Sequence, residues 1–224
     1  MTRAIRISAV LFVAATWGLT ACARAAAPAD PLAKWQAGTN YIQLPAPQAT
    51  SVPAGKVEVL EVFWYGCGHC YALDPVLEEW KKKKPAYVEF VRMPVMWGAP
   101  HQQHAKLYYT LMALNRLDLH TKVFDTIHKE HNMLASPSET DARAMHLAFC
   151  KANGISEQDF NTAYDSMVVA TNLQRAQEAT MRYSVAGVPL LIVNGKYTTD
   201  VSSAGDPPKL LSLVNDLAAS EKKR

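Results

Sequence analysis

Cysteine is scarce in this sequence, and an excess of charge of one sign is absent. Only four cysteines occur among 224 residues, which excludes a small scaffold held together by several disulfides. Lys and Arg number 23 against 20 Asp and Glu, giving a net charge of +3. No basic stripe with interleaved aromatic residues occurs either, so no nucleic acid partner is expected. Repeats and low-complexity tracts are also lacking.

The composition that remains is that of an ordinary globular protein. Hydrophobic residues make up 49% of the chain and charged residues 19%, so disorder is not indicated. A chain of this length can form one sizeable core, or a core with an inserted subdomain.

The first residues have the pattern of an export signal. Arg3 and Arg6 supply positive charge, residues 7–19 form an apolar core that is too short for a comfortable membrane span, and Ala-rich sequence follows. We therefore assign residues 1–27 to a signal peptide and exclude them from the fold. Two cleavage patterns compete: small residues at 23–27 suit an ordinary signal peptidase, whereas Leu19-Thr20-Ala21-Cys22 is similar to a lipoprotein lipobox, in which Cys22 would carry lipid.

Two cysteines form a CxxC motif, Cys67-Gly68-His69-Cys70, directly after the apolar run 57–65 and before a stretch compatible with a helix. A strand running into a helix places Cys67 at the helix N-terminus, where free backbone N–H groups and the helix dipole favour an anion. Cys67 is thus expected to be a nucleophilic thiolate. Outside the cytosol a disulfide formed by this pair persists.

Zinc binding is the competing interpretation of a CxxC motif. A structural zinc site normally has four ligands, and Cys22 and Cys150 form no second closely spaced pair. The sequence therefore favours a redox pair and predicts no metal or other cofactor. Cys150 lies in the apolar helical pattern 144–150, which is typical of a buried, inert thiol.

The chain shows alternating β and α patterns around a long helical block. After a mobile leader over 25–37, the fold is expected to begin near Thr39. Strands are predicted at 41–44, 57–63, 87–93, 190–193 and 196–199, the last two joined by an Asn-Gly turn. Helices are predicted at 70–83, 101–114, 121–131, 138–152, 156–165, 169–183 and 207–219.

This order predicts an α/β protein with a thioredoxin fold that contains an inserted all-helical subdomain. The predicted boundaries are 38–97 for the first part of the thioredoxin-like domain, 98–169 for the helical insertion and 170–224 for the second part. Met93, Met96 and Trp97, which follow the third strand, are candidates either for an apolar groove beside Cys67 or for the core.

Three segments together, 63–71, 185–189 and 194–197, resemble the DsbA family of bacterial periplasmic thiol oxidases. The resemblance covers essentially the whole mature chain. It implies that Cys67 is the exposed nucleophile, that Cys70 is the resolving thiol, and that His69 stabilises the Cys67 thiolate. Val188-Pro189 matches the family's cis-proline loop, which offers backbone to a substrate peptide.

Glu61 matches a buried acid that relays a proton to or from Cys70 in many members of that family. A solvent-exposed carboxylate on an edge strand is the alternative, but the apolar strand around Glu61 favours burial. As the resemblance implies, the protein donates its Cys67–Cys70 disulfide to reduced exported polypeptides in the periplasm and is reoxidised by a DsbB-type membrane partner.

Two other functions stay open at this point. The dipeptide Gly68-His69 differs from the Pro-His of the best-known members and is familiar from protein disulfide isomerases, so an isomerase or reductase is one alternative. Only a short leader precedes Thr39, without an N-terminal dimerisation domain, which favours a monomer. The other alternative is a chaperone-like module that binds peptides without using its thiols.

Overall fold

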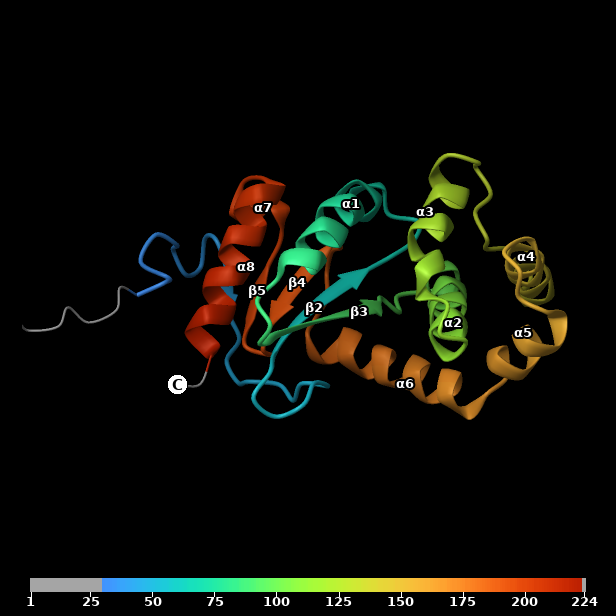
Figure 1. The fold of residues 1–224 in the computed structure, drawn as a ribbon, viewed down its shortest axis with the longest axis horizontal. Helices are drawn as coiled ribbons and strands as arrows, with labels where there is room; N and C mark the ends of the chain where they lie inside the picture. Colours follow the sequence, from blue (N-terminus) through green and yellow to red (C-terminus); the bar gives the residue numbers. More distant parts are fainter. Residues whose placement is uncertain (1–29, 223–224) are drawn as a thin grey trace, which may run out of the picture.

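The fold is built on a five-stranded mixed sheet with helices on both faces (Figure 1). The computed structural model describes residues 30–222. The strand order is β1-β5-β4-β2-β3. The strands are β1 (Ile42–Gln43), β2 (Val57–Phe63), β3 (Val88–Pro94), β4 (Leu190–Val193) and β5 (Tyr197–Thr199).

Strand β2 is an inner strand of the sheet, between β4 and β3, and is buried along its whole length. It pairs in parallel with β3 and antiparallel with β4, and β4 forms a hairpin with β5. A strand covered on both faces is expected to be almost continuously apolar. The sequence Val-Glu-Val-Leu-Glu-Val-Phe fits this expectation except for its two glutamates, which therefore need buried polar partners.

Helices α1 (Gly68–Lys83) and α8 (Pro207–Glu221) cover one face of the sheet, with the short α7 (Val201–Ala204) preceding α8. Side chains from α1, α8, β2 and β4 form one core there. Its buried members include Val57, Val59, Leu73, Leu77, Trp80, Leu191, Leu210, Leu213, Val214 and Leu217.

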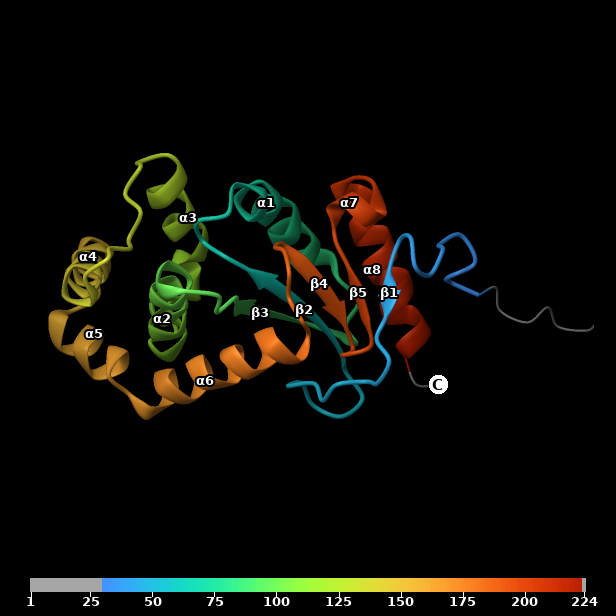
Figure 2. The same ribbon diagram turned by 180° about the vertical axis from the view of Figure 1, so that it is seen from behind.

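The other face of the sheet packs against a helical region that extends beyond the sheet. It consists of α2 (Ala99–Ala113), the 3-10 turn η1 (Leu117–Leu119), α3 (His120–His128), α4 (Glu139–Ala152), α5 (Glu157–Tyr164) and α6 (Met167–Arg182). Seen from behind, α6 runs from this region back toward the sheet (Figure 2). Ser138, Ser156 and Ser166 begin α4, α5 and α6, each accepting a backbone N–H with its side chain.

The predicted fold class is confirmed, and the predicted strands and long helices lie within a few residues of the observed ones. Helix α1 runs through Pro75 as one element. The short α7 was not predicted. The predicted signal peptide, including Cys22, lies outside the described residues. No helix within residues 30–222 is both long and apolar enough to span a membrane.

The expectation of a mobile leader up to residue 37 is wrong for residues 30–37. Leu32 and Trp35 pack against the core beneath α8, and the Trp35 indole Nε1 donates to Asp216 Oδ2 at 2.8 Å. Lys34 forms an ion pair with the same carboxylate at 3.0 Å. The Ala- and Pro-rich composition of this segment gave no sign of these contacts, because they depend on partners about 180 residues later in the chain.

Trp35→Ala should lower the free energy of unfolding by about 2 kcal/mol, because it removes a partly buried aromatic side chain and its hydrogen bond. Urea denaturation followed by far-UV circular dichroism measures this loss. Gln36→Ala, at an exposed neighbour, is the matched control and should change stability by less than about 0.5 kcal/mol. Equal midpoints for Trp35→Ala and the wild type would show that the segment is not part of the folded unit.

Candidate active site

The two thiols of the CxxC motif lie where β2 gives way to helix α1. Cys67 is the N-cap residue of α1, and its Sγ accepts the backbone N–H of Cys70 at 3.3 Å. Cys67 is partly exposed, whereas Cys70 is fully buried one turn into the helix. Both are free thiols, so the structure describes the reduced form. The difference in burial gives the two sulfurs different chemistry.

The pKa of the Cys67 thiol is lowered to about 6. A hydrogen bond from the Cys70 side chain contributes most, and the backbone N–H groups of Cys70 and His69 add to it. The charge of His69 contributes less than these hydrogen bonds, and partial burial of Cys67 acts in the opposite direction. At neutral pH Cys67 is therefore mostly a thiolate, the nucleophilic form of cysteine.

Burial raises the pKa of Cys70, and the neighbouring sulfur of Cys67 raises it further. The charge of the buried Glu61 is also among the groups that raise the pKa of Cys70, with a smaller effect. Cys70 is thus held as a neutral thiol while Cys67 is ionised. One proton stays with the pair in its reduced form.

The loop before β4 faces the exposed thiol. The Val188–Pro189 peptide bond is cis, as the family resemblance implies, and the Val188 carbonyl oxygen lies 3.5 Å from Cys67 Sγ. A groove of about 770 Å³ opens beside this loop. Its walls include Ile42, Leu44, His69, Val188, Pro189 and Leu190. A mostly apolar groove next to a nucleophile can hold an extended apolar peptide.

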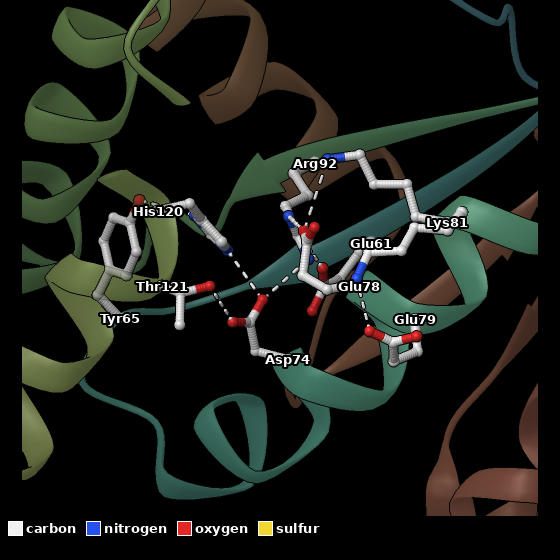
Figure 3. A network of polar contacts seen from close by, with 10 residues as sticks. Glu61, Tyr65, Asp74, Glu78, Glu79, Lys81, Arg92, His120 and Thr121 are labelled. Atoms are coloured by element: carbon white, nitrogen blue, oxygen red, sulfur yellow. Dashed lines mark hydrogen bonds and ion pairs between the residues drawn. The ribbon is translucent and has the colours of Figure 1, made fainter. Parts of the chain in front are cut away.

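Glu61 lies on the face of β2 that α1 covers, and it is buried, which excludes a solvent-exposed carboxylate at this position (Figure 3). Its Oε2 accepts from Arg92 Nε at 2.8 Å, across the register pair that joins β2 and β3. Burial raises the pKa of Glu61, while the Arg92 charge opposes that rise. Glu61 is therefore a buried carboxyl group with a raised pKa.

Arg92 binds two further carboxylates, both on helix α1. Its Nη2 donates to Asp74 Oδ1 at 2.9 Å and its Nη1 to Glu78 Oε1 at 2.6 Å. Asp74 in turn contacts helix α3 through His120 and Thr121 (Figure 3). We call Glu61, Asp74, Glu78, Arg92, His120 and Thr121 the Arg92 cluster. It lies beneath helix α1, which carries the CxxC motif and is called the redox helix below.

The sequence reasoning singled out Glu61, Cys67, His69, Cys70, Val188 and Pro189, and the structure brings all six to one region. It did not find Arg92, Asp74 or His120. Two signals were present: Arg92 interrupts the predicted strand 87–93, and Asp74 sits on the redox helix one turn after Cys70. Neither signal identifies its partners, because the pairing depends on strand register and on a helix about 50 residues away.

Other candidate residues lie elsewhere. Cys150 is buried in α4 and burial raises its pKa to about 12, so it is an inert thiol. Met93 and Met96 are buried in the core rather than lining the groove, and Trp97 donates to the Val185 carbonyl at 2.9 Å. Within residues 30–222, no three His, Cys, Asp or Glu side chains gather in a way that could hold a metal ion.

Comparison with known proteins identifies the family. The DSBA-like thioredoxin domain matches residues 58–215. The chain belongs to this family. The thiol:disulfide interchange protein DsbA of Pseudomonas aeruginosa is 38% identical over 221 residues, which cover 98% of this chain and 97% of the relative. DsbA of Burkholderia cepacia is 38% identical over 201 residues, or 89% of this chain and 90% of the relative.

Solved structures of this family share the fold. The crystal structure of Pseudomonas aeruginosa DsbA superposes with a TM-score of 0.76 at 39% identity, covering 84% of this chain and 95% of that one. The oxidoreductase NmDsbA1 of N. meningitidis gives a TM-score of 0.71 at 26% identity, with 84% and 94% covered. As a DsbA-type protein, the chain is a thiol:disulfide oxidoreductase.

The ultraviolet absorbance of the thiolate in reduced protein should titrate with a midpoint near pH 6, because Cys67 ionises there while the pKa values of Cys70 and Cys150 are raised. Cys70→Ala should move this midpoint upward, since it removes the largest influence that lowers the Cys67 pKa. His69→Gln should move it less.

Cys150→Ser is the control for that titration and should leave the midpoint in place. A wild-type midpoint at the ordinary thiol value of about 8.5 would contradict the description of Cys67 as a thiolate.

Proposed function

We propose that the protein donates its Cys67–Cys70 disulfide to reduced exported polypeptides. The observation that supports this most strongly is the contrast between the two sulfurs: Cys67 is partly exposed with a lowered pKa, and Cys70 is buried with a raised pKa. A pair in which one thiol is stabilised as an anion favours its reduced form, and so gives up its disulfide readily.

Donation proceeds in two exchange steps. A substrate thiolate attacks Cys67 Sγ, forming a mixed disulfide while Cys70 leaves as a thiolate and takes up a proton. A second thiolate of the substrate then attacks the substrate sulfur that is bonded to Cys67, and Cys67 is released as the thiolate. The substrate is oxidised by two electrons and the enzyme is reduced to one thiolate and one thiol.

Glu61 is the proposed source of the proton that Cys70 takes up. It is buried in the same region, and its raised pKa means that it carries a proton over a wider pH range than an exposed glutamate. In the reverse direction, when Cys70 attacks a mixed disulfide on Cys67, Glu61 accepts the proton of the Cys70 thiol.

The groove beside Pro189 is the proposed binding site for the substrate peptide. The Val188 carbonyl oxygen lies 3.5 Å from Cys67 Sγ, so a peptide chain crossing Cys67 passes alongside the backbone of Val188. Backbone hydrogen bonds do not depend on the substrate's side chains. Such a site suits an enzyme that acts on many unfolded polypeptides.

The family also supports a cellular setting for this reaction. We propose that the mature protein acts in the periplasm as a monomer, after removal of residues 1–27, and that a DsbB-type membrane protein reoxidises it. Lipid attachment at Cys22 is the alternative to a free mature chain. The Arg- and Ala-containing pattern of the N-terminal residues supports export.

Cys67→Ser should reduce oxidation of a reduced, unfolded model protein to the rate of the uncatalysed reaction, because no disulfide remains to be donated. Cys150→Ser, at a buried thiol, should keep the wild-type rate. A peptide-binding module would instead keep its function in Cys67→Ser. Equilibration of the wild type with glutathione distinguishes an oxidase from a reductase or isomerase. A Cys67–Cys70 disulfide as hard to reduce as that of a cellular reductant would contradict disulfide donation.

Reduced protein should be more stable to denaturant than oxidised protein at pH 8, and the difference should shrink as the pH falls. The folded-state pKa of Cys67 is about 6, below the value of about 8.5 for a free thiol, so folding favours the thiolate. This stabilisation is present at the upper end of the range and is lost as the pH falls through about 6.

Paired urea titrations of the oxidised and reduced forms between pH 5 and 8 measure this difference. Groups remote from the two thiols titrate alike in both forms and cancel. A difference that stays constant over this range, or grows toward pH 5, would contradict thiolate stabilisation as its source.

A further inference from the structure

The Arg92 cluster connects the redox helix to helix α3 through one buried histidine (Figure 3). His120 is the first residue of α3 and is 4% exposed. Its Nε2 lies 3.4 Å from Asp74 Oδ1, and its Nδ1 lies 2.8 Å from the hydroxyl of Tyr65, two residues before Cys67. His120 therefore touches the chain on both sides of the CxxC motif.

The two contacts of His120 fit one tautomer. Burial lowers the pKa of His120 to about 4, so the ring is neutral at physiological pH. Nε2 faces the Asp74 carboxylate, which can only accept, so the single ring proton is placed on Nε2. Nδ1 then accepts from the Tyr65 hydroxyl, which keeps its proton because burial raises its pKa. The ring proton thus points toward Asp74.

Asp74 is held as an anion by several donors. Burial acts to raise its pKa, but the hydrogen bond from His120, together with the charge of Arg92 and the hydrogen bond from Thr121, leaves the pKa lowered. Thr121 Oγ1 donates to Asp74 Oδ2 at 2.8 Å, so both carboxylate oxygens have partners. Glu61, in contrast, has Arg92 as its one side-chain hydrogen-bond partner among the described residues.

The cluster has more carboxylates than cations. Arg92 meets Glu61, Asp74 and Glu78. Glu78 is partly exposed and also pairs with Lys81 at 3.5 Å, so the two buried carboxyl groups, Glu61 and Asp74, share the single charge of Arg92. The titratable groups around the Arg92 cluster are Tyr65 after β2, Arg92 on β3, Cys70, Asp74, Glu78 and Lys81 on α1, Tyr108 on α2 and His120 on α3. Strand β4, which pairs with β2 at Glu61, contributes only apolar side chains. Buried like charges favour protonation of one member of the set.

We propose that His120 is a positioning residue for the redox pair, holding Asp74 as an anion on Arg92 so that Glu61 is the carboxyl group that gains and releases the proton exchanged with Cys70. This inference rests on the proposed function, in which Glu61 exchanges a proton with Cys70. His120 acts through Asp74 and Arg92 and does not touch the sulfurs in the reaction.

The step affected is the closure of the disulfide from a mixed disulfide on Cys67. The Cys70 thiol gives its proton to the Glu61 carboxylate, and the resulting sulfur anion attacks Cys67 Sγ. The Cys67–Cys70 bond forms, the bond to the outer thiol breaks, and that thiol leaves as a thiolate. The step needs Glu61 ionised beforehand, so its rate should fall as the pH is lowered through the pKa of Glu61.

The experiment measures this step directly. Reduced full-length mature protein is mixed with excess oxidised glutathione, and acid-quenched samples follow the conversion of the mixed disulfide to the enzyme disulfide from pH 4 to 8. We expect His120→Phe to shift the acid limb of the profile to lower pH by about half a unit. Loss of one donor makes Asp74 compete for the shared proton, so Glu61 stays ionised at lower pH.

Thr121→Val is a second variant that removes a donor from Asp74, and it should shift the limb in the same direction. It carries the test on its own if His120→Phe does not fold. His128→Phe is the matched control. His128 also lies on α3, and its Nε2 lies 2.8 Å from the carbonyl oxygen of Tyr65, but it has no hydrogen bond to Asp74. Its acid limb should stay at the wild-type position.

An unchanged acid limb in both His120→Phe and Thr121→Val, a shift to higher pH, or an equal shift in His128→Phe would overturn the role of His120. Glu61→Gln distinguishes this failure from that of the proposed function. If Glu61→Gln leaves the wild-type profile unchanged, Glu61 does not exchange the proton, and the proposal for Glu61 and the inference for His120 both fail.

Discussion

The reactivity of Cys67 depends on the hydrogen bonds between its sulfur and the first turn of helix α1. Cys67 accepts from the Cys70 backbone at 3.3 Å as the N-cap of that helix. This position requires a buried strand that ends just before Cys67 and a helix that begins just after it. The sheet and the packing of α1 on it provide both. The remaining features of the site determine how strongly the thiolate is favoured and where its proton partner lies.

A buried ionic cluster beneath α1 is costly for stability. Removing an ion from water costs several kcal/mol even after the surroundings relax, and one buried cation compensates poorly for the two buried carboxyl groups of Glu61 and Asp74. Apolar side chains would pack in the same place at lower cost. Glu61 and Arg92 occupy paired positions on neighbouring strands, so the cluster is built into the sheet itself. Perturbed ionisable groups beside a reactive thiol are typical of functional sites.

The sequence predicted what depends on local pattern. The strand 57–63, the CxxC motif and the helix after it are contiguous, so their arrangement follows from short-range rules. The family resemblance then supplied the loop around Pro189, which lies far along the chain but carries its own short motif. Arg92, Asp74 and His120 were missed because each is an ordinary residue in its local context. Their significance arises only when β3, α1 and α3 meet, and a single sequence does not state which side chains face each other across elements.

The failed expectation of a mobile leader bears on function as well as on stability. Anchored through Trp35, the segment leads into β1, which pairs with β5 at the edge of the sheet. Strand β1 presents Ile42, 51% exposed, to the groove beside Pro189, and Leu44 lines the groove just after it. Hydrogen bonds from Asn40 to Ser203 and from Thr199 to Asn40 fix this edge against α7. Residues 42–44, which the sequence correctly predicted as a strand, therefore form one wall of the groove, and the segment 30–37 that precedes them is anchored to α8 rather than mobile.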